Sequence, residues 1–114
     1  MKINNVELED IDILDADTAE KYEDSLEVVA GIAKKVEGMK ASQSIRTQCN
    51  TIFEFFNTLF GEGTDKKIFG DKVNLGTCMK AFEELVVTVN TQKEDIEKLV
   101  NKYSPNRAQK RAKK

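Results

Sequence analysis

Apolar residues recur at spacings of three and four along most of the chain, and one proline interrupts its 114 residues, at position 105. Such spacing places side chains on one face of an α-helix, and a proline inside the helix would break it. Strands alternate with a period of two, so a β protein would need a different pattern. The sequence therefore predicts a mainly α fold, with one helical domain over residues 1–105 and a basic C-terminal tail over 106–114.

The apolar spacing predicts three principal helices, over about residues 17–37, 43–60 and 75–103. Asp17 and Glu20 have the spacing of a capping box, which predicts the start of the first helix, and Gly38 is a natural end for it. Ser42 or Ser44 can cap the second helix, which carries four of the six phenylalanines. Because aromatic side chains contribute most to apolar cores, we expect the second helix to be the central one.

The third helix begins after Asn74, a good N-cap residue, and ends before Pro105. Its apolar face is interrupted by a polar stretch over residues 90–95, and β-branched residues precede that stretch. The sequence leaves open whether residues 75–103 form one helix or two.

Residues 3–13 alternate loosely between apolar and polar, which predicts a small N-terminal β strand or hairpin with its turn at Asn4 and Asn5. Residues 61–72 contain three glycines and predict a connection with one helical turn at 65–69. The spacing in this connection matches neither a phosphate-binding loop nor a calcium loop.

Charge is distributed unevenly along the chain. Residues 1–24 hold nine acids and two bases, a net charge of −7, whereas residues 107–114 hold five bases and no acid. Such a chain can attract its own copies head to tail or hold two different partners, and simple solvation of both charged ends is the alternative.

The sequence offers little catalytic or metal-binding chemistry. It contains no histidine, and its two cysteines, Cys49 and Cys78, lack the spacing of a zinc site. Both cysteines fall on predicted apolar faces, so we expect buried thiols and no disulfide. The chain also lacks an apolar run of about 20 residues and a signal-peptide layout. We therefore expect no enzyme, cofactor, metal, membrane span or export.

Four segments carry a resemblance to a known group of proteins: residues 1–8 (MKINNVEL), 15–23 (DADTAEKYE), 60–64 (FGEGT) and 104–111 (SPNRAQKR). The first three resemble small tail-morphogenesis proteins of tailed phages and prophages of Gram-positive bacteria. The last is similar to the C-termini of phage tail assembly chaperones. The resemblance implies a non-enzymatic protein of the host cytoplasm that binds the tape-measure protein or another tail protein.

The preferred contact face for such a partner is the second half of the last helix, because it extends beyond the reach of the other helices. The candidate partner-binding residues are Ile96, Leu99, Val100, Tyr103, Arg107, Lys110 and Arg111. Packing of this face within the monomer, or against a second copy in a homo-oligomer, stays open as an alternative. Two other functions also stay open: a nucleic-acid-associated protein that uses the basic tail, and a structural tail or head-completion component.

Overall fold

The structure is a computed structural model, and it describes residues 1–102. It confirms a mainly α fold with a small two-stranded antiparallel sheet at the N-terminus. The elements, in chain order, are β1 (Lys2–Ile3), β2 (Val6–Glu7), α1 (Ala16–Ala30), α2 (Ile32–Lys35), α3 (Ala41–Phe60), α4 (Thr64–Phe69) and α5 (Leu75–Lys102).

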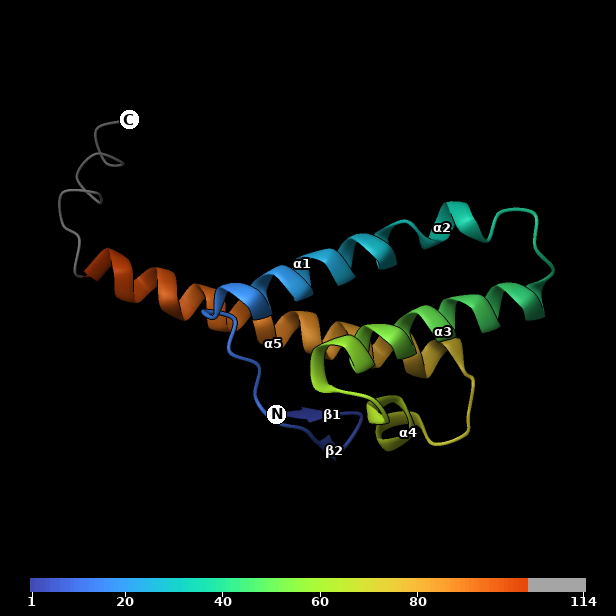
Figure 1. The fold of residues 1–114 in the computed structure, drawn as a ribbon, viewed down its shortest axis with the longest axis horizontal. Coiled ribbons are helices and arrows are strands. Elements are labelled where there is room, and N and C mark those ends of the chain that lie inside the picture. The colour runs from blue at the N-terminus through green and yellow to red at the C-terminus, as the bar shows by residue number, and fades with distance from the viewer. Residues whose placement is uncertain (103–114) are drawn as a thin grey trace.

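The three long helices lie along a common direction, with α1 running opposite to α3 and α5 (Figure 1). Helix α3 packs against α1, α4 and α5 and so joins the other elements. The described chain measures 54 × 32 × 22 Å and has a radius of gyration of 17.3 Å. A compact domain of about 100 residues has a radius of gyration near 13 Å, so this bundle is elongated.

Helix α3 is the central helix, as its phenylalanines predict. Phe55 and Phe56 are buried, and the Phe55 ring lies edge-on to the rings of Tyr22 in α1 and Phe82 in α5, with centroid distances of 6.2 and 5.1 Å. Edge-to-face aromatic pairs add to the stabilisation that comes from apolar burial alone. The aromatic core therefore links the three long helices through one side chain.

The predicted first helix over residues 17–37 is wrong in its middle and at its start. Gly31 separates α1 from α2, and its ψ of −4° departs from the helical value. Glycine lacks a Cβ and therefore restricts the backbone conformation less than other residues do. The N-cap is Asp15, not Asp17: its carboxylate accepts hydrogen bonds from the backbone N–H and the hydroxyl of Thr18 at 3.0 and 2.9 Å.

The predicted serine cap of the second helix is also wrong. Helix α3 begins at Ala41 with Lys40 as its N-cap, and no side chain caps it. Ser44 instead lies within the first turns, where its hydroxyl accepts a hydrogen bond from Gln48 at 3.0 Å. The cap predicted at Asn74 is confirmed, since its Oδ1 accepts from the Thr77 N–H at 3.0 Å.

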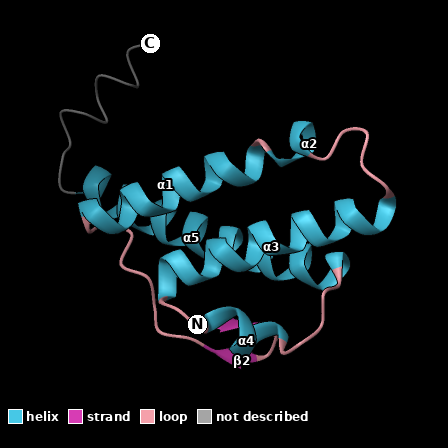
Figure 2. Ribbon diagram, turned by 45° about the vertical axis from the view of Figure 1, so that its right-hand side comes forward, coloured by secondary structure: helices cyan, strands magenta, loops and turns pink. Residues whose placement is uncertain are grey.

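The N-terminal hairpin and α4 lie side by side against the bundle (Figures 1 and 2). Asn4 and Asn5 form the turn with φ of 53° and 63°, the left-handed conformation that asparagine tolerates better than most residues. Asn4 also joins three elements: its Nδ2 donates to the Ile68 carbonyl at 2.9 Å, and its backbone N–H donates to Glu84 at 3.2 Å. The hairpin thereby covers part of α4 and of the first half of α5.

Helix α5 is continuous from Leu75 to Lys102, which settles the question that the polar stretch left open within the described residues. The hydroxyls of Thr88 and Thr91 donate hydrogen bonds to the carbonyls of Glu84 and Val87, four residues earlier, at 2.9 and 3.0 Å. These bonds keep the polar groups of the β-branched stretch satisfied inside the helix.

Candidate protein interface on the last helix

The two halves of α5 have different surroundings. In the first half, Cys78, Ala81, Leu85 and Val89 are all fully buried. Cys49 and Phe55 of α3 contact this half at Cys78 and Phe82. The hairpin also contacts it, through Glu84. The first half of α5 is therefore a core helix.

The second half, residues 90–102, is here called the α5 extension. Figure 1 shows it continuing past the start of α1, beyond the rest of the bundle. Its apolar face consists of Ile96, which is half-buried, Leu99, which is 51% exposed, and Val100, which is 39% exposed. Adjacent exposed apolar side chains on one helix face are a common mark of a protein-binding surface.

Three of the seven predicted partner-binding residues are thus on this face. The other four, Tyr103, Arg107, Lys110 and Arg111, lie outside the described residues. The structure brings the first three together on the α5 extension, as their spacing of three and four predicts.

The start of α1 lies next to the point where the α5 extension leaves the bundle. The Lys93 ammonium lies 5.7 Å from the ring centroid of Tyr22, which is a cation–π distance. Burial raises the pKa of the Tyr22 hydroxyl. Leu14, just before the α1 cap, is 63% exposed. With Asp15 as the N-cap, Leu14 is the residue directly before the cap, a position that apolar residues often occupy.

The acidic residues near the N-terminus are exposed along the hairpin, the loop that follows it and the first half of α1. All nine acids of residues 1–24 are solvent-exposed, and Glu7 and Asp10 pair with the Met1 ammonium at 3.7 and 2.8 Å. The hydrogen bond to Asp10 raises the pKa of that ammonium. This surface, residues 7–24, is called the acidic head below, and it favours a basic partner.

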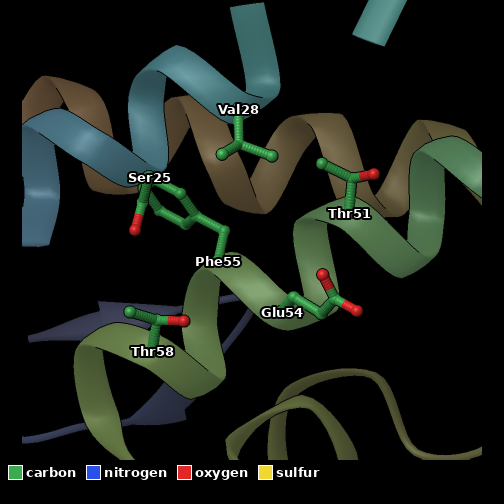
Figure 3. Close-up of a pocket in the computed structure, with 6 residues that line it drawn as sticks. All are labelled: Ser25, Val28, Thr51, Glu54, Phe55 and Thr58. Atoms are coloured by element: carbon green, nitrogen blue, oxygen red, sulfur yellow. The ribbon is translucent and has the colours of Figure 1, made fainter. Parts of the chain in front are cut away.

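A narrow groove runs between α1 and α3 (Figure 3). Its hollow of about 80 Å³ is lined by Ser25, Val28, Thr51, Glu54, Phe55 and Thr58. Small-molecule sites are typically about 300–1,000 Å³, so this groove is too small for one. A shallower hollow of about 440 Å³ lies between the hairpin and α5, and it mixes Lys2 and Lys80 with Glu83 and Glu84. Its charges of both signs give it no preference for one class of ligand.

Cys49 and Cys78 are free, fully buried thiols, as predicted. Burial and the neighbouring Cys49 thiol raise the pKa of Cys78 to about 12. Because the thiolate is the nucleophilic form, Cys78 is inert at neutral pH. The sequence did not predict that these two cysteines are neighbours, since their contact depends on how α3 and α5 pack.

Within residues 1–102, no three metal-ligating side chains gather into a group that could hold an ion. None of the helices in this part of the chain is both long and apolar enough to cross a membrane.

The fold and the α5 extension together define a class of protein: a small helical bundle with an N-terminal hairpin and one helix that projects from it with an apolar face. The chain belongs to the family DUF6673, described as a family of unknown function, whose model matches residues 4–114. No curated protein and no solved structure matches the chain.

Proposed function

We propose that this protein is a non-enzymatic tail-assembly accessory protein of a phage or prophage, a chaperone that binds the tape-measure protein in the host cytoplasm. The observation that carries the proposal is the α5 extension, which presents Leu99 and Val100 to solvent beyond the bundle. The resemblance of four segments of the sequence to phage tail proteins supplies the identity of the partner.

The geometry suits a long helical partner. A tape-measure protein is an extended, apolar helical chain, and an amphipathic helix binds a complementary helix through residues three and four positions apart. Ile96, Leu99 and Val100 have this spacing. The charged residues around them, including Lys93, Glu94 and Glu97, keep the free surface soluble and form a polar rim around the contact.

Charge favours a protein partner over a nucleic acid. The start of α1, which belongs to the acidic head, lies where the α5 extension leaves the bundle, and its exposed carboxylates repel phosphates. The five bases of residues 107–114 are outnumbered by the nine exposed acids of residues 1–24.

Co-expression with a phage tape-measure protein tests the proposal. We expect a soluble complex with the wild-type chain and a loss of that complex with Leu99→Lys, because the substitution places a charge in the contact. The matched control is Val87→Lys, since Val87 is similarly exposed, at 56%, but lies in the first half of α5. A tape-measure protein that stays insoluble with the wild-type chain, or that both variants rescue equally, contradicts the proposal. Recovery of the protein in purified virions would identify a structural component instead.

A further inference from the structure

The spacing of the α5 seam continues from the core into the α5 extension, with one polar position, Gln92, between the two apolar parts. Successive seam positions are spaced alternately by four and three: Cys78, Phe82, Leu85, Val89, Gln92, Ile96 and Leu99. This is the 3.5-residue repeat of a coiled-coil seam, which keeps one face toward one partner over its whole length. In the bundle, α3 packs against α5, and the seam residues are buried or partly buried as far as Val89. The seam residues beyond Val89 are more exposed and can pack against a second helix.

A second copy of α5 provides such a helix only in one direction. If two copies paired in parallel, their bundles would lie at the same end and their acidic heads, each part of a segment with a net charge of −7, would repel. If they pair in antiparallel fashion, the bundles lie at opposite ends. An isologous antiparallel pair places Ile96 of each copy against Leu99 of the other.

The antiparallel arrangement also directs the basic tail of each copy toward the acidic head of the other. With the two-fold axis between residues 97 and 98, the end of α5 at residue 102 lies opposite residue 93 of the second copy. Lys93 marks the place where α1 packs on α5, at its contact with Tyr22. The chain that follows Lys102, which has a net charge of +5 over residues 107–114, therefore starts near α1 and the acidic head of the second copy. Twelve residues follow Lys102 and can span up to about 40 Å, more than enough to reach along that surface.

We propose that the protein forms an antiparallel dimer through the α5 extension, with the basic C-terminal tail of each copy bound to the acidic head of the other. The extension is short, about 20 Å for 13 residues, so the apolar contact alone is small. The charge contact between tail and head adds to it and makes the dimer sensitive to salt. This inference does not depend on the tape-measure protein, although a partner helix would compete for the same face.

Sedimentation equilibrium of the purified full-length chain, over a wide range of concentration, tests the apolar contact. We expect a dimer whose dissociation constant rises about tenfold or more with Leu99→Lys and stays unchanged with Val87→Lys. Circular dichroism and thermal unfolding of both variants check that they fold. A monomer at every concentration, or equal effects of the two substitutions, overturns the dimer.

Charge reversal tests the contact between tail and head. The double variant Lys110→Glu with Arg111→Glu should weaken the dimer and reduce its salt dependence. Lys34→Glu with Lys35→Glu makes the same change in net charge at the other end of the bundle and should do so less. Equal effects of the two double variants would overturn the tail contact.

Zero-length carbodiimide cross-linking of mixed ¹⁴N and ¹⁵N copies distinguishes binding in the second copy from binding in the same chain. Mixed-isotope links between lysines of residues 107–114 and the acidic head support the proposal. Links confined to single-isotope pairs overturn it. All of these experiments use the purified protein alone. A result that overturns the dimer therefore does not decide whether the protein binds the tape-measure protein.

Discussion

The two halves of α5 share one apolar repeat and differ in what covers it. Leu85 and Leu99 occupy equivalent seam positions two heptads apart, yet Leu85 is fully buried and Leu99 is 51% exposed. Helix α3 and the hairpin cover the first half, and the α5 extension lies past them (Figure 1). A helical period therefore determines which face of a helix is apolar, whereas the tertiary structure determines whether that face is core or interface.

The charged residues follow the same division. From residue 93 to residue 102, six of ten residues are charged, whereas residues 75–89 contain three charged residues. A dense mixture of charges around a short apolar stripe keeps an exposed helix soluble while leaving the stripe available. The composition of α5 therefore changes along its length even though its apolar spacing does not.

Substitution by alanine should change the free energy of unfolding far more at Leu85 than at Leu99. Leu85→Ala should lower the free energy of unfolding by ~3 kcal/mol, because it leaves a cavity in a packed core. Leu99→Ala should lower it by about 0.5 kcal/mol or less, since its side chain is already half in water. Urea unfolding followed by circular dichroism, at protein concentrations low enough to keep the chain monomeric, measures both. Similar losses in the two variants would mean that the α5 extension belongs to the monomer core.

The N-terminal hairpin covers part of the first half of α5, and a substitution in its turn tests what holds the hairpin there. Asn4→Gly keeps the left-handed turn but removes the side-chain hydrogen bond to the Ile68 carbonyl, and should cost about 1 kcal/mol of unfolding free energy. Asn5→Gly is the matched control: its φ of 63° suits glycine equally, and we expect little change. Both are measured by urea unfolding. Equal losses would show that the turn conformation, and not the contact to α4, holds the hairpin in place.

Most elements of this fold could be predicted from the sequence. The spacing of three and four located the long helices, Asn74 located the start of α5, and Asn4 and Asn5 located the hairpin turn. These signals are local, so they depend little on the rest of the chain. The errors concern helix ends. Asp15 and Asp17 are both suitable N-cap residues, and Gly31 and Gly38 are both suitable helix ends, so the sequence alone does not decide between them.

The contacts between distant residues could not be predicted. Asn4 meets Ile68 and Glu84 across 64 and 80 residues, and Cys49 meets Cys78 between two helices. A sequence period contains no information about which helix lies beside which. For the same reason, the apolar face of Ile96, Leu99 and Val100 could be predicted, and its exposure required the structure.

A substitution at the N-cap of α1 should have a small effect on thermal stability. This cap lies near the point where the α5 extension leaves the bundle. Hydrogen bonds from the Thr18 N–H and hydroxyl hold the pKa of Asp15 below its ordinary value of 3.8. A lowered pKa stabilises the fold above that ordinary value, and the stabilisation is lost as the pH falls through the folded-state value. Asp15→Asn keeps an oxygen acceptor at the cap but cannot ionise. The wild-type chain should therefore unfold at a slightly higher temperature than Asp15→Asn at pH 7, and the difference should close on acidification toward pH 2. Thermal unfolding across this pH range measures it, with Asp17→Asn as the control at the position that the sequence favoured. If Asp17→Asn gave the larger difference, the helix would begin two residues later, and the α5 extension would begin correspondingly closer to the core.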